Sequence, residues 1–296
     1  MKLAGYGENR LVAELLADLP HLHPEVTVGP GDDCAVIAQR GSKWDLLLKT
    51  DTIVEGIHFE SDALPQSVGW KALCRAISDV AAMGGESQFA LITLGLNSDQ
   101  NVSWVKNLYE GIVRVAKRYN VEIVGGETVR TSGPAFISAS LTGRVEHGRA
   151  VLRSSAEPQD AILVTGHLGG SIAGWHLKFE PRVAEGRWLG QSGLVHSMMD
   201  LSDGLAADLP RLEQASGFQA RLFEKMIPVR AGSTLTGAMN DGEDYELLFT
   251  VGSDTLPTLL QRWPAHFPNL AISVIGEFTS TEYQLDSVGL GGFQHF

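Results

Sequence analysis

The chain has 296 residues, which is enough for about two domains at roughly 150 residues each. Hydrophobic residues make up 44% of it and charged residues 20%, a composition typical of a globular protein with a substantial core. Its 35 acidic residues outnumber its 23 basic residues by 12. We therefore expect no nucleic-acid partner and no anionic membrane surface as partner, because both require clustered Lys and Arg.

No apolar run reaches the length of about 18 residues that a transmembrane helix needs. The N-terminal segment becomes charged and amphipathic too early for a secretion signal. Cys34 and Cys74 form neither a CxxC pair nor a zinc-binding pattern. Reduced thiols and a cytoplasmic location are the resulting expectations.

Apolar spacing predicts the secondary structure of the first half. In chain order we expect a helix over 8–19, strands over 34–39 and 45–51, a helix over 67–83, a strand over 89–96, a helix over 102–119, and strands over 121–124 and 136–145. A polar segment over 146–160 then separates two α/β units of similar size. We place the N-terminal domain at 1–148 and the C-terminal domain at 149–296, the latter beginning with a strand over 161–165.

The usual nucleotide and hydrolase motifs are missing. The sequence contains no GxxxxGK[ST], HExxH, GxSxG or GxGxxG motif in the required context. The Gly29-Pro30-Gly31 turn resembles only a fragment of a phosphate loop, and Pro30 lacks the N–H that a phosphate would need.

Carboxylates instead gather where predicted apolar elements end, often beside glycine. They are Asp32, Asp33, Asp51, Asp79, Glu127, Asp200, Asp203, Glu243, Asp244 and Glu246. Asp79 is placed in the last turns of a helix, where the helix dipole disfavours negative charge. Converging carboxylates repel one another unless a cation holds them, and oxygen ligands suit Mg²⁺. The pattern predicts a magnesium site of the kind used in phosphate chemistry.

Each of these positions also has a purely structural interpretation. The alternatives are an Asx turn at Asp32-Asp33, a strand end at Asp51, a helix N-cap at Ser202 or Asp203, and a loop directly after a short strand for Glu127. A lone histidine such as His58 is more often packed in the core or exposed than a ligand. The joint placement of the carboxylates carries the functional prediction.

Taken together, these segments resemble the thiamine-monophosphate kinase family, in the superfamily that includes aminoimidazole ribonucleotide synthetase. The resemblance runs nearly end to end. It lies in GENRLVAELL (7–16), GDDCAVI (31–37), KTDTIVEGIHF (49–59), KALCRAISDVAAMGG (71–85), VGGETVR (124–130), LTGRVEHGRAVLRSSAEPQD (141–160), MDLSDGLAADL (199–209), GEDYELLFT (242–250) and GFQHF (292–296).

The resemblance implies transfer of the ATP γ-phosphoryl group to thiamine monophosphate, giving thiamine diphosphate and ADP, with several Mg²⁺ ions. It implies a two-domain α/β (α+β) fold of the synthetase type, in which the N-terminal domain has a mixed sheet that completes a β-barrel across a homodimer and the C-terminal domain is α/β. No general base is expected, because the acceptor is already a phosphate anion.

Site residues follow from the matching motifs. The resemblance implies magnesium ligands at Asp33, Thr50, Asp51, Asp79, Glu127, Asp200 and Asp203. It implies ATP contacts at Gly126, Glu127, Arg153 and Ser202. It implies a thiamine monophosphate pocket lined by His58, Glu243 and Phe293.

The chain departs from the family pattern at three positions and in one segment. Glu127 stands where Asp is usual, Lys49 where Ser is common, and Asp241 where Gly is common. Lys49 either replaces a weakly held metal or points away from the site. The segment over 168–182 is short.

Two other functions remain open from the residues. One is another ATP-using synthetase of the same architecture, although Cys34 and Cys74 are not placed to supply its nucleophile. The other is a non-catalytic nucleotide- or thiamine-binding protein, which would not need so many carboxylates.

Overall fold

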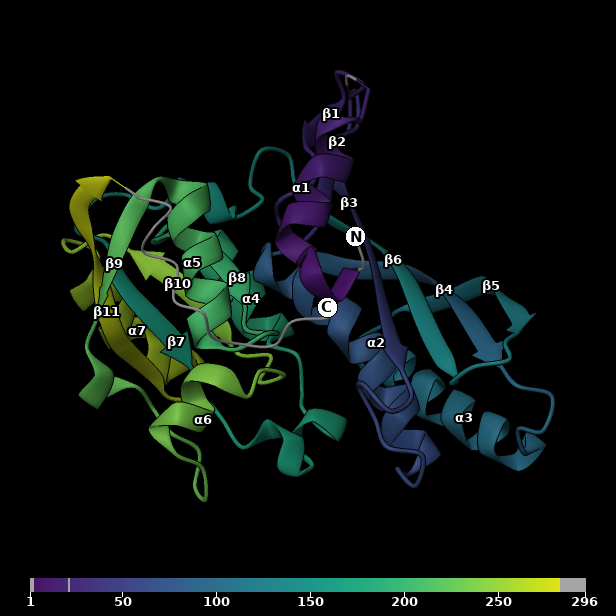
Figure 1. Ribbon diagram of the computed structural model, residues 1–296. Coiled ribbons are helices and arrows are strands. Elements are labelled where there is room, and N and C mark those ends of the chain that lie inside the picture. Colours follow the sequence, from purple (N-terminus) through teal and green to yellow (C-terminus); the bar gives the residue numbers. More distant parts are fainter. Residues whose placement is uncertain (1–2, 21, 283–296) are drawn as a thin grey trace.

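The computed structural model describes residues 3–20 and 22–282. Two lobes lie side by side, each built around one β-sheet (Figure 1). A short helical turn, η1 (Leu3–Gly5), and helix α1 (Glu8–Ala17) precede the first sheet. Within the described residues, no helix is both long enough and apolar enough to span a membrane.

The first sheet has six strands in the order β1-β2-β3-β6-β4-β5. They are β1 (Val26–Val28), β2 (Ala35–Ala38), β3 (Trp44–Val54), β4 (Glu86–Leu96), β5 (Glu122–Arg130) and β6 (Phe136–Glu146). Neighbouring strands are antiparallel except β4 and β5, which are parallel, so the sheet is mixed. Helices α2 (Pro65–Ala82) and α3 (Val102–Arg118) cover one face of it (Figure 1).

Close packing of α2 against α3 depends on two glycines. A Cβ at Gly69 would lie 2.0 Å from the carbonyl oxygen of Leu108, and one at Gly111 would lie 2.1 Å from that of Gln66. Glycine therefore lets the two backbones touch. This contact buries almost the whole length of α2 between the sheet, α3 and the second lobe, and so fixes the side chains that α2 carries.

The second sheet has five antiparallel strands in the order β8-β10-β7-β11-β9. They are β7 (Ala161–Thr165), β8 (Val195–Asp200), β9 (Phe218–Leu222), β10 (Leu247–Val251) and β11 (Ile272–Glu282). The helices of this lobe are α4 (Val183–Ser192), α5 (Leu205–Ser216), α6 (Leu235–Asn240) and α7 (Leu256–His266). Short helical turns are η2 (Arg153–Ser155), η3 (Ser171–Ala173), η4 (Trp175–Leu177) and η5 (Glu224–Met226).

Both faces of the second sheet are apolar. On β7, Ile162 and Val164 belong to the core formed with α5 and α6, whereas Leu163 belongs to the core formed with α4 and α7. Alternate side chains of a strand point to opposite faces, so helices cover the sheet on both sides. The molecule therefore has a two-domain α+β fold.

Three local expectations from the sequence are wrong. Asp51 lies inside β3, because β3 pairs with β6 as far as Val54. Glu127 lies inside β5, because β5 pairs with β4 as far as Arg130. Neither Ser202 nor Asp203 caps α5 with its side chain. Instead, the backbone N–H groups of both donate to Asp208 Oδ2, at 3.0 and 2.9 Å.

Candidate active site

Three buried carboxylates converge where the two lobes meet. Asp33 precedes β2, Asp79 lies near the end of α2, and Asp200 is the last residue of β8. One carboxylate oxygen from each lies within 4.8 Å of the others. We call these three residues the acidic cluster.

The acidic cluster is electrostatically costly without a cation. Burial raises the pKa of Asp79 well above its ordinary range, although the Lys49 charge opposes this. Burial, helped by the charge of Asp33, raises the pKa of Asp200 to about 6. Asp33 Oδ2 is buried and has no hydrogen-bond partner. A buried acceptor left unpaired is destabilising, so this oxygen and its neighbours fit a hard divalent cation.

Basic side chains of the protein lie around the acidic cluster and pair with its carboxylates and their neighbours. The pairs are Lys49 Nζ with Asp79 Oδ1 at 2.6 Å, Arg75 Nε with Asp51 Oδ2 at 2.9 Å, Arg211 Nη1 with Asp203 Oδ2 at 2.6 Å, and Arg153 with Asp33. The region therefore holds fixed positive charge able to face phosphate groups as well as negative charge able to bind metal.

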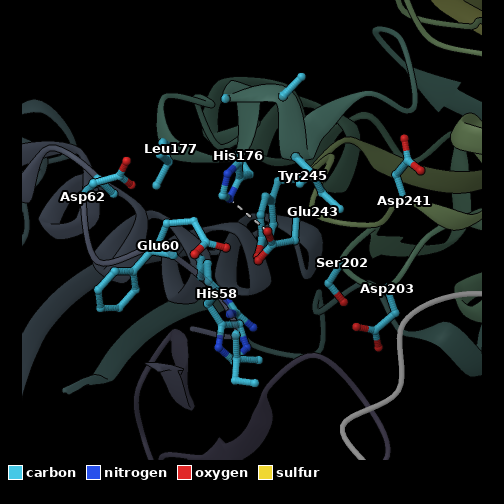
Figure 2. A pocket seen from close by; sticks show the side chains of 17 residues that line it. His58, Glu60, Asp62, His176, Leu177, Ser202, Asp203, Asp241, Glu243 and Tyr245 are labelled. Carbon is cyan, nitrogen blue, oxygen red and sulfur yellow. Dashed lines mark ion pairs between the residues drawn. The ribbon is translucent and has the colours of Figure 1, made fainter. Parts of the chain in front are cut away.

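A cavity of about 360 Å³ is lined by Arg75, one helical turn before Asp79, and by Ser202 and Asp203, which follow Asp200 (Figure 2). Both lobes line it, with His58 and Arg75 from the first and Ser202, Asp203 and Glu243 from the second. Glu243 lies next to Ser202, because its backbone N–H donates to the Ser202 carbonyl oxygen at 2.7 Å. Its volume is in the range of a small-molecule site.

A fully buried lysine contacts three of the residues that line the cavity, His58, His176 and Glu243. Lys71 on α2 is 0% exposed, and its Nζ donates to the carbonyl oxygen of His58 and to Glu243 Oε2 at 2.7 Å. It also lies 2.7 Å from His176 Nδ1. Burial lowers the pKa of Lys71 to about 8. Burial opposes ionisation of Glu243, but hydrogen bonds from the side chains around it and the charge of Lys71 outweigh this and lower its pKa to about 2.

An unusual backbone turn places the Glu243 side chain in the wall of the cavity. Glu243 and Tyr245 both have positive φ, at 55° and 52°. Their backbone N–H groups donate to the carbonyl oxygens of Ser202 and Leu201. The turn points Glu243 toward His176 (Figure 2), while Tyr245 is buried and stacks on Phe179 with ring centroids 4.0 Å apart. Such left-handed non-glycine residues are typical of functional sites.

Some predicted site residues lie away from the acidic cluster. Thr50 points to the face of the first sheet that α2 does not cover, and its hydroxyl lies 3.1 Å from Ser140 Oγ. Gly126 and Glu127 lie on edge strand β5, separated from β3 by β6 and β4. Glu127 is exposed and accepts a hydrogen bond from the N–H of Thr128. Phe293 lies outside the described residues.

Sequence reasoning named Arg153 and Lys49 but missed Lys71, Arg75 and His176. Lys71 and Arg75 lie on α2 with Asp79, at four-residue intervals within an otherwise apolar helix. That spacing places all three side chains on one face of the helix, a pattern that can be recognised in the sequence. His176 on η4 gave no comparable signal, because the short segment that carries it has no periodic pattern. Asp241, where glycine is common, accepts a hydrogen bond from the N–H of Gly170 at 2.7 Å.

Comparison with known proteins gives two family-model matches. Residues 31–145 match the model described as AIR synthase related protein, N-terminal domain, and residues 148–283 match its C-terminal counterpart. Among curated proteins, the thiamine-monophosphate kinase of Bacillus subtilis is 33% identical, covering 93% of this chain and 95% of its own length. That of Rhodopirellula baltica is 39% identical over 78% of each chain.

Comparison with solved structures gives similarity to the same kinases. The structure titled "AaThiL complexed with AMPPCP and TMP" superimposes with a TM-score of 0.85 at 32% identity, covering 100% of this chain and 99% of that one. A crystal structure of thiamine monophosphate kinase from Aquifex aeolicus gives a TM-score of 0.74 at 30% identity, covering 95% of this chain and 96% of that one.

Proposed function

Because the chain belongs to the thiamine-monophosphate kinase family, we propose that it transfers the γ-phosphoryl group of ATP to thiamine monophosphate, forming thiamine diphosphate and ADP. The observation that carries this proposal is the buried acidic cluster beside a cavity that both lobes line. Two anionic substrates need such a combination, with a charge-neutralising centre at one end and a ring-binding pocket at the other.

Asp33, Asp79 and Asp200 are the proposed core of the magnesium site, with Asp51 and Asp203 as adjoining ligands. Bound there, Mg²⁺ ions would neutralise phosphate charge and hold donor and acceptor in line. The unpaired, buried Asp33 Oδ2 supports this assignment.

The chain's own residues position the substrates. Arg153, held against Asp33, and Ser202 are proposed to contact ATP. His58 and Glu243 are proposed to bind the thiamine end, with Phe293 packing on it as the family resemblance implies. The acceptor oxygen already carries negative charge, so we assign no general base.

A homodimer is the proposed assembly, with the uncovered face of the first sheet as its interface and a barrel completed between protomers. Leu48, Phe89, Leu91 and Val124 on that face are 38%, 43%, 48% and 57% exposed and line one groove. Exposed apolar side chains in such a patch favour burial against a partner.

The same face carries two of the remaining ligand assignments. Thr50 on β3 lies opposite Ser140 on β6, and Glu127 on β5 lies opposite Thr93 on β4. We propose that Thr50, Glu127 and Gly126 contribute to metal or ATP binding where this surface meets a second protomer.

We also place the domain boundary between residues 148 and 149. The buried free thiols of Cys34 and Cys74 favour a reducing, cytoplasmic compartment.

Product analysis tests the proposed function. Purified protein is incubated with γ-³²P-labelled ATP, Mg²⁺ and thiamine monophosphate, and the expected product is thiamine diphosphate labelled in its terminal phosphate. ADP without thiamine diphosphate would point to another synthetase reaction of the same architecture. ATP binding with no turnover would point to a non-catalytic binding protein.

A further inference from the structure

Arg75 is the one lysine or arginine among the described residues that line the cavity. The same wall carries several carboxylates, which are those of Glu60, Asp62, Asp203, Asp241 and Glu243. A phosphate group that enters this cavity therefore meets mostly negative charge. The guanidinium of Arg75 is the side chain of the wall best able to attract it, because it keeps its positive charge at any physiological pH.

Two nitrogens of this guanidinium have no hydrogen-bond partner. Nε donates to Asp51 Oδ2 at 2.9 Å, which orients the group. Neither Nη1 nor Nη2 has a partner among the described residues, although Nη1 is buried, and a buried donor without an acceptor is costly. The side chain is 12% exposed where it lines the cavity. Planar guanidinium N–H groups of this kind suit the oxygens of a phosphate.

The position of Arg75 on α2 is intermediate between the two parts of the site. Lys71, Arg75 and Asp79 follow one another on one face of the helix, each about 6 Å further along its axis. Lys71 contacts His58 and Glu243, the residues proposed to bind thiamine, whereas Asp79 belongs to the acidic cluster. The phosphate of thiamine monophosphate is attached to the thiamine rings and has to reach the metal centre. It therefore lies between these two parts, at the level of Arg75.

We propose that Arg75 is a substrate-binding residue: its unpaired N–H groups hold the phosphate of thiamine monophosphate, which is the acceptor of the transfer, while Asp51 orients the guanidinium. The proposal rests on the proposed function and adds to it a contact between the protein itself and the acceptor phosphate. This contact distinguishes thiamine monophosphate from thiamine, which has no phosphate to accept the hydrogen bonds.

Steady-state kinetics of Arg75→Met test the contact. Loss of a charge-assisted hydrogen bond to phosphate should raise KM for thiamine monophosphate at least about tenfold and leave KM for ATP within about twofold of the parental value. Arg75→Lys keeps the charge without the planar fork and should recover part of the loss. Arg114→Met, the same change at an exposed arginine of α3, is the control and should keep both parental values. A parental KM for thiamine monophosphate in Arg75→Met, or an equal rise in both KM values, overturns the proposal.

Inhibition by thiamine separates a phosphate contact from structural support of the pocket. Thiamine competes with thiamine monophosphate for the ring pocket but makes no phosphate contact, so we expect the same inhibition constant for the parent and Arg75→Met. An inhibition constant that rises as much as KM for thiamine monophosphate would assign Arg75 a structural role and overturn the proposal. If Arg75→Met does not fold, Arg75→Lys is compared in the same way, with a smaller rise in KM and no rise in the inhibition constant as the expected result.

The two failures are distinguishable. If the parent chain forms no thiamine diphosphate, the proposed function is wrong. If it forms the product while Arg75→Met keeps the parental KM values, the proposed function stands and the role of Arg75 is wrong.

Discussion

Lys49 Nζ lies 2.6 Å from Asp79 Oδ1, so a cation of the protein itself neutralises one carboxylate of the acidic cluster. The side chain points into the cluster, not away from it, because alternation along β3 places Lys49 and Asp51 on the face that packs on α2. The family resemblance leads us to expect serine at this position. A divalent ion bound at the acidic cluster, as we propose, would therefore compete with Lys49 for the same Asp79 carboxylate.

We predict that Lys49→Ser binds divalent cations more tightly. The substitution removes one positive charge and frees Asp79, so the dissociation constant for Mn²⁺, measured by electron paramagnetic resonance, falls several-fold or more. Lys43→Ser, an exposed change just before the same strand, serves as the control and keeps the parental value. Equal or weaker Mn²⁺ binding by Lys49→Ser would show that the ion pair does not limit metal binding.

Gly69→Ala tests the packing that holds α2 in place. The added methyl meets the Leu108 carbonyl at 2.0 Å, so the helices must separate, and we expect a loss of about 1–3 kcal/mol in the free energy of unfolding. Gly133→Ala, whose new Cβ finds only the Thr131 hydroxyl at 3.6 Å, is the control. Urea denaturation measures both, and equal midpoints would refute the close contact.

Glu146 and Arg187 join the first sheet to α4 of the second lobe, with Arg187 Nη1 2.6 Å from Glu146 Oε2. Hydrogen bonds from Arg187 lower the pKa of Glu146 from its usual 4.5 to about 2. Because the folded-state pKa is depressed, the pair stabilises the fold above pH 4.5, and this contribution is lost as the pH falls toward 2.

Glu146→Gln should therefore lower the free energy of unfolding at pH 7, by about 1 kcal/mol or less because the carboxylate is partly exposed. The difference between parent and variant should shrink between pH 4.5 and 2 in urea titrations. A difference independent of pH would assign the effect to packing. Glu110→Gln, on the exposed side of α3, is the matched control.

Leu91→Asp tests the dimer. Leu91 is 48% exposed in the middle of the uncovered sheet face, and a carboxylate there would be buried unpaired in the proposed interface. We expect the parent to sediment as a dimer and Leu91→Asp as a monomer in analytical ultracentrifugation. Leu260→Asp, at an exposed position on α7, should stay dimeric. A parent chain that sediments as a monomer would refute the assembly.

Local pattern predicted the elements well where apolar spacing was strong. The strand over 161–165 and the helix that carries Asp79 lie where the spacing places them. The ends of strands were harder to predict. Asp51 and Glu127 resemble residues that end a strand, but β3 and β5 continue past them because they pair with β6 and β4. Cross-strand hydrogen bonds decide those ends, and they depend on residues distant in the sequence.

The site was predictable in its carboxylates and less so in its basic partners. Asp33, Asp79 and Asp200 converge because the start of β2 and the ends of α2 and β8 meet at one place. The four-residue spacing of Lys71, Arg75 and Asp79 places Lys71 on the same face of α2 as Asp79, and this can be recognised in the sequence. The partners of Lys71 cannot, because His176 and Glu243 meet it only once η4 and the turn at Glu243 fold against α2.

The most direct measurement of the central claim is the rate of thiamine diphosphate formation by Asp33→Asn compared with Asp99→Asn, an exposed loop change. Asn cannot supply the second anionic oxygen of Asp33 that is buried without a partner. We predict that Asp33→Asn loses at least about a hundredfold in rate at saturating ATP and thiamine monophosphate, partly restored by higher Mg²⁺, while Asp99→Asn keeps the parental rate. Equal rates for Asp33→Asn and the parent at every Mg²⁺ concentration would contradict phosphoryl transfer at the acidic cluster.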